Sequence, residues 1–278
     1  MSGVQASLLP GGRLHLHHGP IDLVIAANDE ARRDAFATAA ARFDGLLEEL
    51  VAELPALRRP LGEAALSGPV ARAMLGAALP FRPAFITPMA AVAGAVADAV
   101  LAAMAEAPGL TRAYVNNGGD VAVFLAEGAR MSAAMPGGRI ALDSAAPWRG
   151  VATSGWRGRS HSLGIADAVT VLARNAAAAD AAATMIANAV DLPFHPAISR
   201  RPAAALAPDS DLGQRLVTVD VGNLGPAETG RALDAGQAFA QTLIACGLIG
   251  GAHLMLNGRS RSLGPALALR EAKESLDA

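Results

Sequence analysis

A carboxylate and a hydroxyl lie four residues apart in an alanine-rich segment, at Asp180 and Thr184. In a helix, residues with this spacing lie on the same face, one turn apart. A carboxylate among alanines is unfavourable to bury unless it is paired or binds a cation. Carboxylate and hydroxyl oxygens suit a hard ion such as Mg²⁺. The pair is therefore a candidate magnesium site, and the alternative, an aspartate that points to solvent from an amphipathic helix, stays open at this point.

A second candidate site is the run Asn116-Asn117-Gly118-Gly119-Asp120. Two glycines allow positive φ angles, so the backbone can bend sharply and approach a ligand closely. The flanking side chains offer amide and carboxylate groups to such a ligand. The same residue types also form an ordinary hairpin turn, and both interpretations stay open at this point.

Residues 152–167 form a third candidate site, in which hydroxyl, imidazole and guanidinium groups stand among glycines. Backbone N–H groups and hydroxyl donors in such a segment can surround a phosphate or a heterocycle. The alternative is a polar surface loop. The run from Gly158 to Ser162 resembles a hydrolase G-x-S-x-G elbow but ends in serine, so a serine nucleophile is not expected. The functional side chains here are Thr153, Ser154, Arg157, Arg159, Ser160, His161 and Ser162.

We expect these three segments to meet. Asp120, Ser154, Ser160, His161 and Asp180 are predicted to line one concave surface. A further pair, His15 and His17, would face the same way on a strand, as two transition-metal ligands could. No third ligand lies near them in the sequence, so a partly exposed strand is the favoured interpretation.

The elements that must position these residues follow from hydrophobic periodicity and turn residues. Strands and helices come in mixed groups, which favours an α+β fold with mixed or antiparallel sheets packed with helices. We treat residues 1–278 as one domain, with about 12 peripheral residues at each end. The expected elements are two strands within 13–27, a helix at 30–53, a buried helix at 85–104, strands within 112–126 connected by 116–120, a strand pair at 139–142 and 148–154, a strand at 168–173, a helix at 175–190, a polar connection at 195–211, a strand at 215–221, a helix at 228–246 and a final strand at 252–257.

Composition argues against several classes of function. The net charge is −2, and no basic stripe with stacking aromatic residues is evident, so nucleic-acid binding is not expected. The only lysine, Lys273, lies in a polar tail, which argues against Schiff-base and P-loop chemistry. The only cysteine, Cys246, excludes disulfide and cysteine zinc sites within one chain, and its apolar surroundings predict a buried structural thiol.

Residues 85–104 are about as long as a membrane span. Pro88 and Asp98 interrupt the apolar run, and a carboxylate near the bilayer centre is costly. A buried helix is therefore expected there. The N-terminus lacks a charged region followed by an apolar one, so we expect a cytoplasmic protein without a membrane partner.

Four segments together resemble the UPF0280 family, which is similar to the ApbE superfamily of flavin transferases. They are GPIDLVIAAND, ITPMAAVAGAVAD, VNNGGDVAVF and TSGWRGRSHSLGIADAVTVLARNAAAADAAATMIAN, within residues 14–257. The resemblance implies an ApbE-like fold, bound FAD or FMN, and Mg²⁺ held by Asp180 and Thr184. It also implies attack by a substrate Thr or Ser hydroxyl on the FMN phosphate, assisted by the cation.

With this resemblance in place, Asp120, Ser160 and His161 are the expected catalytic residues. The predicted cofactor-binding residues are Asn116, Asn117, Gly118, Gly119, Thr153, Ser154, Gly155, Arg159 and Ser162.

The chain departs from the flavin transferases at two places. Their G-x-x-K-G lysine is absent where residues 91–94 stand, and their H-I-I-D-P-x-T-G segment is collapsed into residues 160–167. These losses would remove contacts to the nucleotide and to the transferred group, so the chemistry can differ while the fold persists.

Three hypotheses follow, with an enzyme favoured. The first is a Mg²⁺-dependent flavin-binding protein or FMN-transferase-like enzyme. The second is an enzyme that acts on another small molecule, such as a nitrogen heterocycle or another nucleotide. The third is a non-catalytic flavin-binding or assembly protein. A small-molecule ligand is expected in each case, and a second copy of the chain or a neighbouring redox enzyme is a candidate partner.

Overall fold

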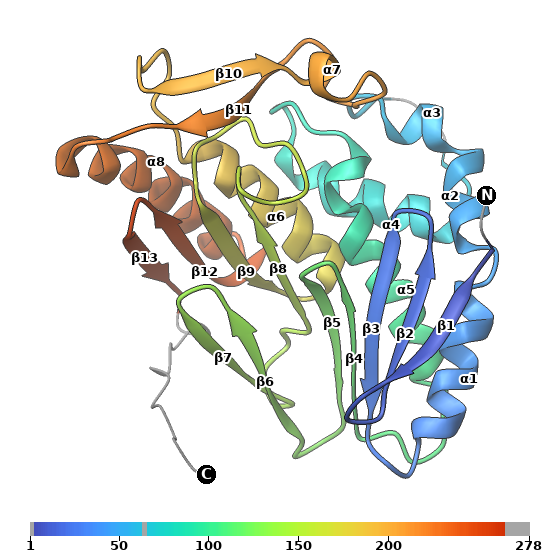
Figure 1. The fold of residues 1–278 in the computed structure, drawn as a ribbon. Coiled ribbons are helices and arrows are strands. Elements are labelled where there is room, and N and C mark those ends of the chain that lie inside the picture. Colours follow the sequence, from blue (N-terminus) through green and yellow to red (C-terminus); the bar gives the residue numbers. More distant parts are fainter. Residues whose placement is uncertain (1–2, 63–65, 265–278) are drawn as a thin grey trace.

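The computed structural model describes residues 3–62 and 66–264 (Figure 1). Its centre is a nine-stranded sheet in which every neighbouring pair of strands is antiparallel. The fold is therefore α+β, as the mixed grouping of elements predicted. In spatial order the strands are β1 (Gln5–Leu9), β2 (Arg13–His18), β3 (Ile21–Ala27), β4 (Arg112–Asn117), β5 (Asp120–Leu125), β8 (Gly150–Ser154), β9 (Ala168–Ala173), β12 (Ile249–Leu256) and β13 (Arg259–Leu263).

Helices cover one face of this sheet and enclose the main hydrophobic core (Figure 1). Alternate side chains of the strands point into that core because successive residues of a strand face opposite sides. In β5 and β9, for example, Ala122 and Val171 face the helices. The helices are α1 (Arg32–Phe43), α2 (Leu46–Ala52), α3 (Leu54–Leu57), α4 (Pro69–Ala78), α5 (Val92–Met104), α6 (Ala176–Ala189) and α8 (Pro226–Ala245), with short 3₁₀ turns η1 (Leu79–Phe81) and η2 (Pro88–Ala91).

Helices α5 and α6 meet at very close range because both are built from small residues. A Cβ atom on Gly94 of α5 would lie 2.2 Å from the carbonyl oxygen of Ala176 in α6. Such a separation is far inside van der Waals contact, so the crossing requires glycine at this position. Asn175 is the N-cap of α6, and its side chain accepts a hydrogen bond from the N–H of Ala178. The predicted helices at 85–104 and 175–190 thus form, the first of them beginning at Val92.

The opposite face of the sheet carries a separate hairpin, β6 (Arg130–Met135) and β7 (Gly138–Asp143). Ile140 and Leu142 pack there against Val123, Val151 and Leu172 in a smaller apolar cluster. The expected pairing of 139–142 with 148–154 is wrong. β7 pairs with β6, whereas β8 joins the central sheet between β5 and β9.

A small substructure lies across one end of the sheet, at the top of Figure 1. We call it the cap: β10 (Ile198–Pro202), α7 (Ala203–Leu206), the loop 207–215 and β11 (Leu216–Val221). β10 and β11 pair only with each other, in an antiparallel hairpin. The expected polar connection at 195–211 therefore contains a strand and a short helix, which its prolines and polar residues concealed.

Four other expectations are corrected. The helix expected at 30–53 is divided at Asp44 and Gly45, because Gly45 adopts φ 77°. The connection expected at 116–120 shortens to the two glycines Gly118 and Gly119 between β4 and β5. The N-terminal residues include the exposed edge strand β1, and a further strand, β13, follows β12. Cys246 is exposed, because α8 ends at Ala245 and the thiol lies beyond the helix.

No helix in the described ranges has the length and apolar character that crossing a bilayer requires. Lys273 and the C-terminal residues predicted to be peripheral lie outside those ranges.

Candidate functional site

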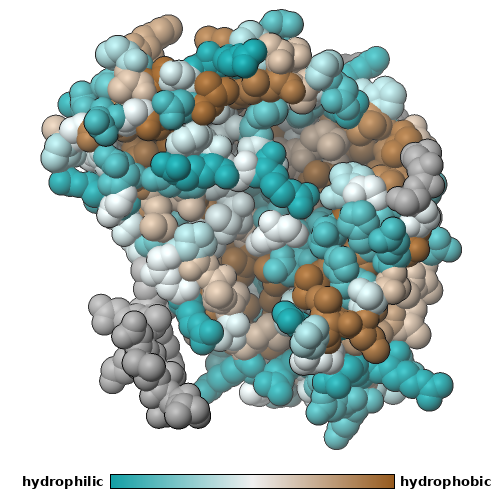
Figure 2. All heavy atoms as spheres, viewed as in Figure 1, coloured by the Kyte–Doolittle hydropathy of each residue, from teal (hydrophilic) through white to brown (hydrophobic). Residues whose placement is uncertain are grey.

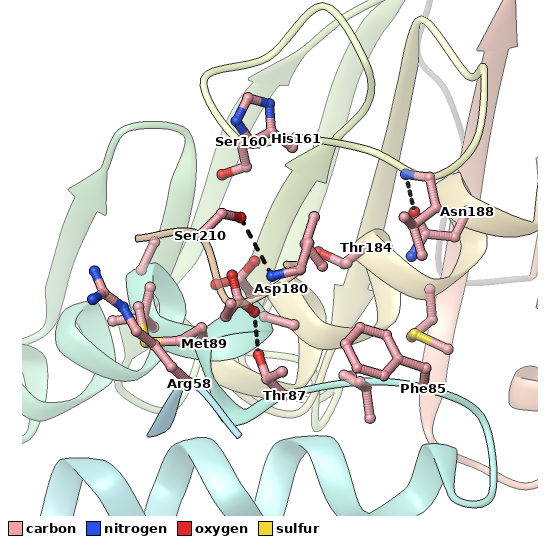
Figure 3. Close-up of a pocket in the computed structure, with 18 of the residues that line it drawn as sticks. Arg58, Phe85, Thr87, Met89, Ser160, His161, Asp180, Thr184, Asn188 and Ser210 are labelled. Atoms are coloured by element: carbon pink, nitrogen blue, oxygen red, sulfur yellow. Dashed lines mark hydrogen bonds between the residues drawn. The ribbon is translucent and has the colours of Figure 1, made fainter. Parts of the chain in front are cut away.

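A pocket of about 390 Å³ opens between α6, the loop 155–163, η2 and the cap (Figure 3). Apolar residues gather beneath the cap on the face shown in Figure 2. The pocket contains six of the predicted site residues, namely Asp120, Arg159, Ser160, His161, Asp180 and Thr184. Its other polar lining residues are Arg58, Thr87, Asn188, Asp209, Ser210 and Asp211, and its apolar ones are Phe85, Ile86, Met89, Ala90, Val92, Ala93, Leu163, Met185, Ala207 and Leu212.

One wall of the pocket is a face of α6. Asp180, Thr184 and Asn188 follow one another at intervals of four residues, so they lie on the same side of the helix. The half-buried carboxylate of Asp180 accepts a hydrogen bond from the N–H of Gly94 through Oδ2 at 3.1 Å. The Asp180 side chain is therefore directed toward the first turn of α5, whose Gly94 N–H donates to it, and not only toward solvent.

Asp120 enters the same pocket from the start of β5. Its side chain is buried, and Oδ1 accepts a hydrogen bond from the N–H of Thr153 at 3.3 Å. Burial raises the pKa of Asp120 to about 7, although the Thr153 hydrogen bond and the positive charge of Arg159 act in the opposite direction. Desolvation therefore outweighs both favourable contacts to the carboxylate.

The two carboxylates influence each other. Burial raises the pKa of Asp180 well above its usual range, and the negative charge of Asp120 raises it further. Hydrogen bonds from the N–H groups of Gly94 and Ala93 lower it. The negative charge of each carboxylate disfavours ionisation of the other, so this pair favours a shared proton or a bound cation.

The donor set fits Mg²⁺ better than a transition metal. In the two described ranges no group of three or more His, Cys, Asp and Glu side chains could hold an ion. Magnesium usually takes one or two carboxylates and fills its remaining positions with water and substrate phosphates. Asp180, Asp120 and the Thr184 hydroxyl provide that number of protein oxygens beside an open space.

Within residues 3–62 and 66–264, no third His, Cys, Asp or Glu side chain joins His15 and His17 in a group that could hold a metal ion. His15 contacts Asp22 of β3 at 3.0 Å, and the ring centroids of His15 and His17 are 6.3 Å apart. Both rings are half-buried on the sheet, as the interpretation of a partly exposed strand pair expected.

The loop 155–163 brings Arg159, Ser160 and His161 to the pocket, and all three are exposed. Figure 3 shows Ser160 and His161 on this loop. Asn188 of α6 holds this loop, because its Oδ1 accepts a hydrogen bond from the N–H of Leu163 at 2.9 Å. The α6 face therefore positions the loop as well as contributing carboxylate and hydroxyl groups.

Several predicted cofactor-binding residues support the site from outside. Asn116 Oδ1 accepts a hydrogen bond from the N–H of Gly119 at 2.8 Å, which closes the turn. Asn117 Nδ2 donates to the carbonyl of Ala93 at 3.1 Å, which joins that turn to α5. Eight of the nine predicted cofactor-binding residues are not among the pocket-lining residues, so the concave surface forms without Ser154. They are Asn116, Asn117, Gly118, Gly119, Thr153, Ser154, Gly155 and Ser162.

Three of those eight lie under the loop or in the sheet. Ser162 is buried, and its hydroxyl accepts a hydrogen bond from the N–H of Gly164. The hydroxyl groups of Thr153 and Thr170 are 2.8 Å apart across β8 and β9. A Cβ atom on Gly155 would lie 2.5 Å from the carbonyl oxygen of Asp167, so the loop begins where two backbone segments touch.

The cap supplies a wall that the sequence reasoning missed. Arg58 donates to Asp209 at 2.6 Å, and the hydroxyl of Thr87 donates to Asp211 (Figure 3). Arg215 of the cap also lies over the ring of Phe85. The run Pro208-Asp209-Ser210-Asp211 was a visible signal, since two acids stand together in an otherwise apolar stretch.

A bacterial family described as "AbpE bacteria" matches residues 6–262. The UPF0280 protein of Methanothrix thermoacetophila is 43% identical over 112 residues, which is 38% of this chain and 46% of that protein. The UPF0280 protein of Methanopyrus kandleri is 38% identical over 175 residues, which is 60% of this chain and 69% of that protein. The chain thus spans about half the length of the first relative.

Among solved structures, the apo form of the flavinyl transferase ApbE from Pseudomonas stutzeri is similar, with a TM-score of 0.43 and 15% identity. The similarity covers 95% of this chain and 96% of that one.

Proposed function

This chain belongs to the UPF0280 proteins and to the bacterial family described as AbpE, and from that premise we propose that it is a Mg²⁺-dependent flavin-nucleotide-binding protein with FMN-transferase-like chemistry. One observation carries the proposal. Asp120 and Asp180 line one pocket beside Thr184, and the negative charge of Asp120 raises the pKa of Asp180. A cation would remove the repulsion between these carboxylates.

The residues of the pocket divide into three groups by position. Asp180, Thr184 and Asp120 would hold Mg²⁺, which supplies positive charge that neutralises the phosphate oxygens of a bound nucleotide. Arg159 lies at the mouth, where its guanidinium can donate to a phosphate. Phe85, Met89 and Leu163 offer apolar surface to a ring system.

The proposed reaction is a phosphoryl-group transfer. The hydroxyl oxygen of a second substrate forms a bond to the FMN phosphorus of FAD, the bond from that phosphorus to the AMP oxygen breaks, and AMP leaves. The hydroxyl proton passes to a base of the pocket, for which Asp120 and His161 are the candidates. Ser160, beside His161, would orient the second substrate, and a hydroxyl of a neighbouring redox protein is the proposed acceptor.

The test is a calorimetric titration of FAD into the protein with and without Mg²⁺, repeated on Asp180→Ala. We expect micromolar binding that needs Mg²⁺ and is lost in the variant. Asp34→Ala is the matched control, since Asp34 is an exposed aspartate in the first turn of α1. Binding that is equal with and without Mg²⁺, or equal in Asp180→Ala, would contradict the proposed site.

A second candidate function is an enzyme that uses this pocket for another phosphate-bearing small molecule. The absence of a lysine at residues 91–94 favours it, because the transferases place a contact to the nucleotide there. ADP serves as the discriminating probe. Binding of ADP as tight as that of FAD would mean that the flavin ring is not recognised, whereas a clear preference for FAD supports the first proposal.

A further inference from the structure

A second cavity, of about 440 Å³, lies against the other side of the α5–α6 crossing. It shares no lining residue with the first pocket. Alanine, glycine and proline residues of α4, η1 and α6 form most of its wall, with Phe81, Leu248 and Ile249. Its volume lies in the range of small-molecule sites, which are apolar with few polar groups. The two polar side chains in its wall are Asp98 and Asn175.

Asp98 contributes a carboxylate to this apolar cavity. Its oxygens accept hydrogen bonds from the N–H groups of Ala176 and Ala177, at 3.0 and 2.8 Å. An ionised carboxylate accepts about four hydrogen bonds, so each oxygen retains acceptor capacity. In the described part of the chain, no arginine or histidine forms an ion pair with Asp98.

The electrostatics select the kind of ligand. Asp98 occupies the positive end of α6, so the N–H groups that would attract an anion are already bound. Asn175 adds an amide oxygen, which accepts one hydrogen bond from Ala178 and can accept another. Burial raises the pKa of Asp98 to about 6, which leaves the group mostly ionised at neutral pH. A negative charge in an apolar wall favours a cationic partner.

We propose that this cavity binds a small primary amine, with its ammonium group at Asp98 and its apolar body against Phe81 and the alanine wall of α6. The inference does not depend on the flavin proposal, because the cavity, its residues and its ligand are different. Either proposal can fail without affecting the other.

Three probes of equal shape test the charge preference on the unmodified protein: 2-phenylethylamine, 2-phenylethanol and phenylacetate. We expect the amine to bind at least about tenfold more tightly than the alcohol, since a hydrogen bond to a charged group is the stronger kind. Phenylacetate should bind more weakly still. Binding is followed by ¹H–¹⁵N NMR titration, in which the amides of Ala177, Ala178 and Ala182 should shift, because these residues line the cavity.

Two variants locate the site. Asp98→Asn should reduce the amine affinity to that of the alcohol. Ala178→Leu should abolish binding of both probes, because Ala178 is a half-buried residue of the cavity wall. Ala73→Leu repeats the test from α4 at an exposed position, in case the α6 variant does not fold.

Three results would overturn the proposal. Equal affinities of amine and alcohol would show an apolar hollow without charge recognition. Shifts confined to the Asp180 pocket would place the amine elsewhere. A dimer in analytical ultracentrifugation that becomes a monomer in Ala73→Leu would assign this wall to an interface between copies of the chain.

Discussion

Asp98 and Asp180 each bind the first turn of the helix that carries the other. Asp98, on α5, accepts hydrogen bonds from Ala176 and Ala177 at the start of α6. Asp180, on α6, accepts one from Gly94 at the start of α5. The N-terminal N–H groups of a helix have no partner within the helix, and the helix dipole favours a negative charge beside them. Each aspartate therefore caps the neighbouring helix, and the two helices fix each other's position.

Removal of the Asp98 carboxylate that binds the start of α6 should lower the stability of the protein. Asp98→Ala removes both acceptors, so two N–H groups lose their partner and we expect a decrease of about 1–2 kcal/mol in the free energy of unfolding. Urea denaturation followed by circular dichroism measures it. Asp34→Ala is the control, and a surface change of this kind should stay within about 0.5 kcal/mol. Equal effects of the two substitutions would contradict a capping role.

The close contact between α5 and α6 predicts that Gly94→Ala is strongly destabilising. The new Cβ would lie 2.2 Å from the backbone of Ala176, so the helices must move apart. We expect a loss of about 2–3 kcal/mol, typical of overpacking against an unyielding neighbour. Gly230→Ala in α8 is the matched control, because no atom lies within 4 Å of its added Cβ. That change should stabilise the protein by about 0.5–1 kcal/mol through helix propensity.

The thermal stability of the magnesium-free protein should fall as the pH rises through neutrality. The pKa of Asp120 is raised from 3.8 to about 7, and that of Asp98 from 3.8 to about 6. At a pH between the ordinary value and the raised value of each group, the folded state therefore binds more protons than the unfolded state. This contribution to stability is complete below the unfolded pKa and is lost as the pH rises through the folded pKa. We expect the melting temperature to be several degrees lower at about pH 7.5 than at about pH 5.5.

Comparison with Asp120→Asn isolates the effect from other titrating groups. The asparagine variant cannot ionise at this position, so its melting temperature should change less across that range. Added Mg²⁺ should stabilise the unmodified protein more at the higher pH, where the carboxylates are free to bind it. A variant with the same pH dependence as the unmodified protein would exclude Asp120 as the source.

Arg159 should matter for flavin binding in a way that the nearby Arg157 does not. Arg159 lines the pocket and its charge lowers the pKa of Asp120, whereas Arg157 pairs with Asp167 at 2.7 Å. We expect Arg159→Ala to weaken FAD binding about tenfold, the worth of one charged hydrogen bond. Arg157→Ala should leave the affinity within about twofold.

The same Arg159→Ala variant provides a second measurement. Removal of the positive charge should raise the pKa of Asp120 further, so Mg²⁺ binding should require a higher pH than in the unmodified protein. Equal flavin affinities of the two arginine variants would mean that the mouth of the pocket does not contact the phosphates.

Local patterns predicted most of the central elements. The strands around Gly19, the strands on either side of Gly118 and Gly119, and the helix after Asn175 all depend on turn residues, caps and periodicity that act within a few positions. The combination of Asp180 and Thr184 on one helical face was also readable, because helical geometry alone places residues four apart together.

The errors arose from distant segments and from strands with atypical sequences. Cys246 stands in an apolar run, but its exposure is set by where α8 ends relative to the sheet. The strand at 139–142 was predicted, but its hairpin partner β6, which ends only two residues before β7, was missed because its sequence, RMSAAM, has no β-branched or aromatic residue. In the cap, β11 was predicted as the strand at 215–221, whereas β10 was missed because its sequence, ISRRP, has few of the residues that strands prefer.

The sequence by itself determined which residues carry charge and hydroxyl groups, and that α6 presents Asp180 and Thr184 on one side. Only the tertiary structure decided that Asp120 lies in the same pocket as Asp180, which is far from it along the chain. It also decided that Asp98 caps α6 beside a separate cavity. The physical reason is the distance along the chain over which each kind of interaction acts. Helical spacing and turn chemistry act over a few residues, whereas burial, charge coupling and helix crossing depend on which segments the folded core brings into contact.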